Sequence, residues 1–166
     1  MGDMFYWCSS LTSLDVSNLN ALNLNDMGDM FNRCSSLTSL DVSSFNTVNV
    51  NDMEEMFYGC SSLTSLDVSK FIIPEQSYGM FVNCSGLQRL VVPLTASIIS
   101  NYYSHYPDAC EGVGTQASPC ILVYPEGFDL EKTQEGDGWY MWKGGYFTDA
   151  PKFPLGDVNH DGYIAV

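Results

Sequence analysis

The sequence contains very few basic residues, and this scarcity excludes several classes of ligand. Only 6 of its 166 residues are lysine or arginine, against 20 aspartates and glutamates, which gives a formal net charge of −14. Nucleic acids and anionic lipid surfaces are bound largely through lysine and arginine, so we expect neither as a partner. Two interpretations of the acidity remain: it keeps an exported protein in solution, or it attracts calcium.

Long apolar runs and catalytic side-chain patterns are also missing. No apolar stretch approaches the ~20 residues of a membrane helix, so we expect no membrane insertion. Histidine occurs only 2 times, and nothing in the sequence places His105 and Cys110 as a nucleophile pair. The chain has no nucleophile-elbow or phosphate-loop pattern, and its carboxylates form no evident catalytic pair. We therefore predict that it is not an enzyme.

What the sequence has in abundance is an internal repeat. The segment CSSLTSLDVS occurs at residues 8–17, 34–43 and 60–69. Cys8, Cys34 and Cys60 are 26 residues apart (34 − 8 and 60 − 34), and a fourth copy starts at Cys84, after 24 residues. A period of about 20 to 29 residues is typical of leucine-rich repeats, whose units stack on their neighbours. Such stacks usually present a binding surface, so we expect binding rather than catalysis.

Each repeat is predicted to contain one short helix and one short strand. The apolar side chains of residues 27–34 recur at i, i+3, i+4 and i+7, which is one face of a helix, and Asp26 is placed to cap it. Leu37, Leu40 and Val42 follow the L-x-x-L-x-L spacing of a leucine-rich-repeat strand. We therefore predict an α/β fold: a right-handed leucine-rich-repeat solenoid with a short helix and a short parallel strand per 26-residue repeat.

Stacking of the repeats predicts columns of equivalent side chains about 4.8 Å apart. The cysteine column is expected to consist of buried reduced thiols, because thiols in a ladder do not converge tetrahedrally on a metal. Cys110 and Cys120 lie outside this register, and a disulfide between them is left open. The predicted columns are Phe5, Phe31, Phe57 and Phe81; Cys8, Cys34, Cys60 and Cys84; and Leu14, Leu40, Leu66 and Leu90.

A second ladder is predicted on the outward face of the strands, where Asp15, Asp41 and Asp67 stand in a row. Like charges about 5 Å apart repel, so serine hydrogen bonds, raised pKa values, a cation or a basic partner must offset the repulsion. Arg89 replaces the serine in the fourth repeat and is placed to neutralise Asp67. This face is either a binding surface or a row of serine-solvated carboxylates. Its candidate binding residues are Asp15, Asp41, Asp67, Ser39, Ser65 and Arg89.

The repeat pattern covers residues 1–93 and then decays. Residues 94–147 are predicted to form the last repeat and a C-terminal cap, because their large aromatic side chains suit the open end of a solenoid. In the alternative interpretation, Trp139 and Trp142 form a platform on which sugar rings stack. Residues 148–155, which contain two prolines, predict a linker.

Residues 156–166 contain the beginning of a calcium-binding loop. The spacing D-x-N-x-D-G-x-I places Asp157, Asn159 and Asp161 at ligand positions, and Tyr163 offers its carbonyl group. The acidic ligand that completes such a loop would lie two residues beyond Val166. We therefore predict weak or no calcium binding by this segment and no other cofactor.

These motifs resemble those of the BspA-type leucine-rich-repeat surface proteins of gut and oral bacteria. The unit MFNRCSSLTSLDVSSFNT at residues 30–47 carries the resemblance, which extends over residues 1–93. The segment GDVNHDGYI at residues 156–164 resembles the first calcium loop of a dockerin module. The resemblance implies a secreted or cell-surface protein that adheres to host matrix proteins or to other bacteria. For a complete dockerin it also implies a cohesin-like partner, and it brings no catalytic residues.

Two functions of different classes are consistent with these features. The first is a non-enzymatic protein-interaction or adhesion module, which we expect to be a monomer. The alternative is an accessory, carbohydrate-binding region of a larger dockerin-bearing extracellular enzyme or assembly, or else a structural spacer. The sequence begins within a repeat and ends within the calcium loop, so we expect a fragment of a longer protein. Self-association through the first repeat is left open.

Overall fold

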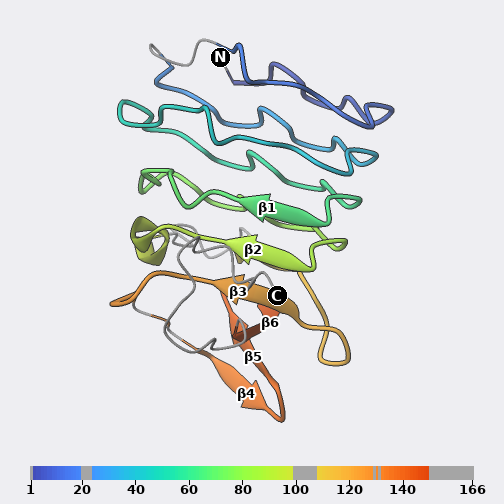
Figure 1. Ribbon diagram of the computed structural model, residues 1–166, viewed down its shortest axis with the longest axis vertical. Coiled ribbons are helices and arrows are strands. Elements are labelled where there is room, and N and C mark those ends of the chain that lie inside the picture. Colours follow the sequence, from blue (N-terminus) through green and yellow to red (C-terminus); the bar gives the residue numbers. More distant parts are fainter. Residues whose placement is uncertain (1, 20–23, 99–107, 129, 131, 150–166) are drawn as a thin grey trace, which may run out of the picture.

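The structure is a computed structural model that describes residues 2–19, 24–98, 108–128, 130 and 132–149. Successive turns of the chain stack along the long axis of the molecule. The antiparallel strands of residues 134–149, which we call the closing strands, lie at the opposite end from the first turn (Figure 1). The strands are β1 (Ser65–Asp67), β2 (Arg89–Val91), β3 (Cys120–Val123), β4 (Gln134–Gly136), β5 (Trp139–Trp142) and β6 (Gly145–Asp149), and a 3-10 helix, η1 (Leu94–Ile98), follows β2.

The strands form one mixed sheet in the order β1-β2-β3-β6-β5-β4. Strands β1, β2, β3 and β6 are parallel, whereas β4, β5 and β6 pair in antiparallel fashion. Equivalent residues of successive repeats face each other in the parallel part, with Leu66 opposite Leu90 and Leu90 opposite Leu122. The stack of repeats therefore continues into β3 and is closed by antiparallel hairpins. Strand β6 extends to Asp149, into the segment predicted to be a linker.

The turns that precede β1 stack in the same direction, with single bridges in place of strands. Ser13 pairs with Ser39, and Asp52 pairs with both Asp26 and Gln76, all in parallel orientation. Ser13 and Ser39 are 26 residues apart (39 − 13), as are Asp26 and Asp52 (52 − 26). The period of the sequence is therefore the spacing at which successive turns pair.

The predicted helix in each repeat is wrong, and with it the α/β leucine-rich-repeat solenoid. The described residues contain no α-helix, and the fold is almost entirely β. Within residues 27–34, the amides alternate between a carbonyl three residues back, as from Asn32 to Asp29 (3.0 Å), and one in the next turn, as from Phe31 to Met56 (2.9 Å). Asp29 and Arg33 also have positive φ angles of 57° and 60°, which a right-handed helix cannot accommodate.

Asp26, predicted to cap a helix, closes a tight turn instead, and so does the equivalent Asp52 of the next repeat. Asp26 Oδ1 accepts a hydrogen bond from the Gly28 backbone N–H at 3.0 Å, and Asp52 Oδ1 accepts one from the Glu54 N–H at 2.9 Å. An aspartate that accepts from the amide two residues later reverses the chain locally without a helix. The apolar spacing within residues 27–34 is thus produced by consecutive turns, which still point Met27 and Phe31 into the core.

A column of phenylalanine rings runs through the middle of the stack. The rings of Phe31, Phe57 and Phe81 are fully buried, and Phe5 is partly buried. Ring centroids of Phe31 and Phe57 are 5.7 Å apart with planes tilted by 7°, and those of Phe57 and Phe81 are 6.0 Å apart with a tilt of 4°. Full burial of each such ring contributes on the order of 1.5–3 kcal/mol.

The cysteine column lies beside these rings, and all 6 cysteines are free thiols. Each buried thiol of Cys34, Cys60 and Cys84 donates to the carbonyl of a phenylalanine in the preceding turn, at 3.0 to 3.2 Å. Burial raises the pKa of Cys34 to about 11 and that of Cys60 to about 12. Cys8, by contrast, is exposed. The two cysteines outside the column, Cys110 and Cys120, are buried and do not form a disulfide.

Candidate functional site

The outward-facing aspartates of successive repeats lie along one side of the stack, which we call the aspartate face. In β1, Ser65 and Asp67 are exposed on either side of the buried Leu66. The same alternation recurs in the turn before, where Leu40 is buried and Asp41 is exposed. A shallow groove of about 630 Å³ runs along this face and is lined by Ser13, Leu14, Asp15, Ser39, Leu40, Asp41, Ser65 and Asp67.

Each aspartate on this face closes a turn with the serine two residues later. Asp15 Oδ1 accepts a hydrogen bond from the Ser17 backbone N–H at 2.9 Å, and the same contact recurs at Asp41 and Asp67. Hydrogen bonds from Ser17 lower the pKa of Asp15, and those from Ser43 lower the pKa of Asp41. Of the mechanisms that could offset the mutual repulsion, serine hydrogen bonds are therefore present, whereas raised pKa values are not found at Asp15 and Asp41.

A lysine that was not among the predicted site residues lies beside the aspartate face. Lys70 borders a groove of about 230 Å³ together with Asp41 and Asp67, and its charge helps to lower the pKa of Asp41. Lys70 directly follows the repeated segment, where the two earlier repeats carry small polar residues, so comparison of the repeats could have revealed it. Arg89, predicted to neutralise Asp67, pairs in register with Ser65 on the neighbouring strand.

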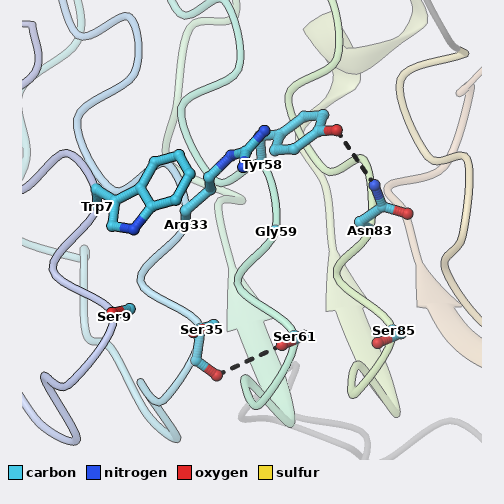
Figure 2. A pocket seen from close by; sticks show the side chains of 9 residues that line it. All are labelled: Trp7, Ser9, Arg33, Ser35, Tyr58, Gly59, Ser61, Asn83 and Ser85. Carbon is cyan, nitrogen blue, oxygen red and sulfur yellow. Dashed lines mark hydrogen bonds between the residues drawn. The ribbon is translucent and has the colours of Figure 1, made fainter.

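A second row of side chains crosses the turns on another surface of the stack. Figure 2 shows Trp7, Arg33, Tyr58 and Asn83 following one another across successive turns, beside a parallel row of serines. They border a shallow groove of about 450 Å³, which we call the aromatic–arginine groove. It is lined by Trp7, Ser9, Arg33, Ser35, Tyr58, Gly59, Ser61, Asn83 and Ser85.

The guanidinium of Arg33 lies between two aromatic rings in this groove. Its central carbon is 4.4 Å from the ring centroid of Trp7 and 5.6 Å from that of Tyr58. The Tyr58 hydroxyl accepts a hydrogen bond from Asn83 Nδ2 at 3.4 Å. Among the residues that the structure describes, no carboxylate lies within ion-pair distance of Arg33. The guanidinium therefore lies near two aromatic rings, and its charge has no ion-pair partner among the described residues.

This groove was not predicted, although the repeat contains a signal for it. Trp7, Arg33, Gly59 and Asn83 each stand directly before a cysteine of the column. The cysteine and the serine after it are constant in the repeats, whereas the position before the cysteine carries a different residue each time. A position that varies beside constant core positions is more consistent with the surface than with the core.

The closing strands bury one of the two tryptophans predicted to stack on sugars. Trp142 is fully buried, and its ring makes edge contacts with Phe128 and Phe147. Trp139 is partly exposed, and its ring meets Tyr146 edge-on with centroids 5.3 Å apart. The prediction of a two-tryptophan sugar platform is therefore wrong, because a buried ring has no face to offer.

The predicted calcium ligands Asp157, Asn159, Asp161 and Tyr163 lie outside the described residues. Within the described ranges, no three or more histidine, cysteine, aspartate or glutamate side chains converge in a way that would hold a metal ion. The described part of the chain also contains no helix with the length and apolarity needed to span a bilayer.

Comparison with known proteins agrees with the division between the repeated turns and the rest. A family model described as "Mycoplasma protein of unknown function, DUF285" matches residues 1–92, which is more than half of the 166 residues. No curated protein and no solved structure matches the chain. The family match ends before the dockerin-like segment and gives that resemblance no support. The chain therefore belongs to the DUF285 family, which is associated with BspA-like surface repeat proteins.

Proposed function

We propose that the chain is a non-enzymatic interaction module of a secreted or cell-surface bacterial protein, and that its aspartate face binds a basic region of a partner protein. The observation that carries this proposal is the row of exposed carboxylates of Asp15, Asp41 and Asp67, repeated on successive turns of the stack. Family membership supports the cell-surface location, because the family is associated with BspA-like surface proteins. A host matrix protein or a bacterial surface protein is the expected class of partner.

The shape of the groove supports a macromolecular partner. A small-molecule site usually encloses its ligand, whereas the groove along the aspartate face is shallow and open across at least three turns. The carboxylates stand side by side on a surface and do not face one another across a cleft, an arrangement that suits charge recognition better than acid–base catalysis. Complementary charge would guide the partner's lysines and arginines to this face.

The turn geometry allows the charge to be removed without removing the turn. In an Asp15→Asn, Asp41→Asn and Asp67→Asn triple variant, the amide oxygen can still accept the serine N–H that the aspartate accepts now. We expect the triple variant to keep its thermal stability and to lose most of its binding to an immobilised matrix protein. Binding of the unaltered chain should weaken as salt rises above physiological strength, where the screening length is about 8 Å.

The test is saturation binding of the full chain to a panel of purified laminin, fibronectin and collagen at physiological salt. The matched control is Glu75→Gln, Glu111→Gln and Asp137→Asn, which removes three exposed charges away from the aspartate face. Equal loss of binding in both triple variants would mean that net charge alone causes the loss, and it would contradict a site on this face. Full binding by the aspartate-face variant would contradict the proposal outright.

The alternative function, an accessory carbohydrate-binding region of a dockerin-bearing enzyme or assembly, stays a prediction. Its calcium loop lies outside the described residues, and Trp142 of its proposed sugar platform is buried in the core. No described feature favours it over the interaction module.

A further inference from the structure

We propose that the aromatic–arginine groove is a second binding site, separate from the aspartate face, for a glycan that carries a carboxylate on one sugar of an otherwise neutral chain. Arg33 would bind the carboxylate, while Trp7, Asn83 and the serine row would contact the neighbouring neutral sugars. The proposal shares no residue with the aspartate face, so either can fail without the other.

The position of Arg33 is what indicates an anionic ligand. The chain has only 6 basic residues, and of those that the structure describes Arg33 alone lines this groove. The central carbon of its guanidinium lies 4.4 Å from the ring centroid of Trp7 and 5.6 Å from that of Tyr58. A guanidinium held in this way keeps its N–H donors at the edge, where they match the two oxygens of a carboxylate.

The acidic neighbours of Arg33 do not neutralise it directly. Its charge reaches Glu55 and slightly counteracts the burial and the Asp29 charge that raise the pKa of that carboxyl. Both carboxylates instead accept hydrogen bonds from the side-chain amide of Asn32. Arg33 therefore keeps donor capacity for a ligand that arrives from solvent.

The backbone at this position makes the presence of large side chains costly. Trp7, Arg33 and Asn83 have φ angles of 59°, 60° and 59°, in the left-handed region that glycine and asparagine occupy most easily. For other residues this conformation costs roughly 1–2 kcal/mol. Each exposed cation–π contact recovers only about 0.5–1 kcal/mol, so stability alone does not explain tryptophan and arginine here. A strained position that carries such groups is a reason to infer a binding role.

The rest of the groove suits neutral sugars. Ser9, Ser35 and Ser85 present hydroxyl groups that have no side-chain partner among the described residues, and Asn83 adds an amide. The turns repeat at about the strand spacing of 4.8 Å, and one pyranose advances a glycan by a similar distance. Trp7 is 54% exposed, so its ring can contact the apolar face of a sugar.

An acidic peptide fits the groove less well than a glycan. Peptides commonly add a strand to an open sheet edge or insert apolar side chains into a hydrophobic groove. Along this row, the backbone amides already donate between turns, as from Trp7 to Asn32 at 2.8 Å and from Arg33 to Tyr58 at 2.6 Å. The groove is also shallow and open, and serines line it beside the rings of Trp7 and Tyr58. A polyanionic glycan is disfavoured too, because the chain carries a net charge of −14.

The experiment is calorimetric titration of the full chain with 3′-sialyllactose and, in parallel, with lactose, which lacks the acidic sugar. We expect saturable binding of 3′-sialyllactose and at least about tenfold weaker binding of lactose, the usual size of a charge-assisted hydrogen-bond pair. Arg33→Gln should lower the affinity for 3′-sialyllactose to the level of lactose. Arg33→Lys, which keeps the charge but loses the planar donors, should retain part of the preference.

The matched control is Lys70→Gln, which removes one exposed positive charge beside the aspartate face and should leave both affinities unchanged. Trp7→Leu should weaken the binding of both sugars, because it removes the stacking surface, and should weaken 3′-sialyllactose more, because it also removes one of the rings beside Arg33. A glucuronate-terminated disaccharide, titrated beside 3′-sialyllactose, tests whether any sugar carboxylate is accepted. The proposal is overturned if neither acidic sugar binds at millimolar concentration, if lactose binds equally well, or if only a tetraglutamate peptide binds through Arg33.

Discussion

The repeated turns and the closing strands bury their aromatic side chains in different ways. In the repeats, phenylalanine rings stack on phenylalanine rings, and the planes of Phe57 and Phe81 are tilted by only 4°. In the closing strands, Trp142 meets Phe147 at an interplanar angle of 66°. Both arrangements exclude solvent completely. Parallel ring columns are therefore a consequence of repetition, because each turn presents the same residue in the same orientation, whereas hairpins bring unlike residues together.

Repetition has the same effect on the surface as in the core. The aspartates of the aspartate face and the serines of the aromatic–arginine groove come from equivalent positions of successive turns, so a residue that recurs in each repeat forms a row. The antiparallel pairing of β4, β5 and β6 places residues of opposite strand direction beside one another instead. Both proposed binding surfaces consequently belong to the repeated turns.

Removing one ring from the middle of the phenylalanine column should produce the largest effect. Phe57 is fully buried and stacks on Phe31 at 5.7 Å and on Phe81 at 6.0 Å. Phe57→Ala would leave a cavity between two turns and should cost about 3–5 kcal/mol of unfolding free energy. Urea denaturation of the full chain, followed by circular dichroism, measures this loss.

Phe5→Ala is the matched control for the column. Phe5 is only partly buried, and its one stacking partner in the described structure is Phe31, at 5.5 Å. The same truncation should therefore cost clearly less than at Phe57. Equal losses at the two positions would show that position within the column does not determine the cost.

Alanine substitutions at two glycines, one in a repeat and one in the segment before β3, should lower stability by an intermediate amount. Gly59 and Gly114 have similar φ angles, 67° and 65°. A methyl group on Gly59 would lie 3.4 Å from Arg33 Cγ, whereas one on Gly114 would clash with the backbone oxygen of Tyr146. We expect Gly114→Ala to cost about 2–3 kcal/mol and Gly59→Ala about 1 kcal/mol, measured by urea denaturation. A larger loss at Gly59 would contradict this ranking.

The strand part of each repeat was accessible to sequence reasoning, because alternation of burial directly fixes which way a side chain points. Leu66 is buried between exposed Ser65 and Asp67, as the spacing of the motif predicts. The helix was not accessible in the same way, because Asp29 and Arg33 adopt left-handed conformations that neither residue type demands. A helix and a series of tight turns can both bury apolar residues at this spacing. The hydrogen bonds between turns determine which of the two structures forms.

The candidate sites likewise combine features that the sequence predicts with features that depend on turn and hairpin geometry. The aspartate face follows from the strand period, but the serine contacts that lower the pKa of Asp15 and Asp41 depend on turn geometry. The aromatic–arginine groove combines Arg33 with Tyr58, which occupies a different position of its repeat, so a search for identical columns overlooks it. The burial of Trp142 depends on how hairpins pack, which composition does not specify.

Repetition also stacks like charges, and this gives the smallest expected effect. Asp29 and Glu55 occupy the same position of neighbouring turns, and the side-chain amide of the buried Asn32 donates to both carboxylates. Partial burial and the charge of Asp29 raise the pKa of Glu55, and partial burial also raises that of Asp29. The pair is therefore less stable in its fully ionised form than the two groups would be in the unfolded chain.

Because the folded-state pKa of Glu55 is raised, the folded protein binds more protons than the unfolded chain, and stability falls as pH rises through that pKa. Glu55→Gln removes the charge but keeps an oxygen that accepts from Asn32, so it should raise the free energy of unfolding at pH 7, measured by urea denaturation, by a few tenths of a kcal/mol. The gain should shrink as pH falls toward the ordinary glutamate pKa of about 4.5, where the unaltered carboxyl is protonated. Asp137→Asn, which removes an exposed carboxylate between β4 and β5, is the control and should leave the free energy of unfolding at pH 7 unchanged. A gain that is the same at pH 4.5 and pH 7 would mean that shape, and not stacked charge, limits stability at this position.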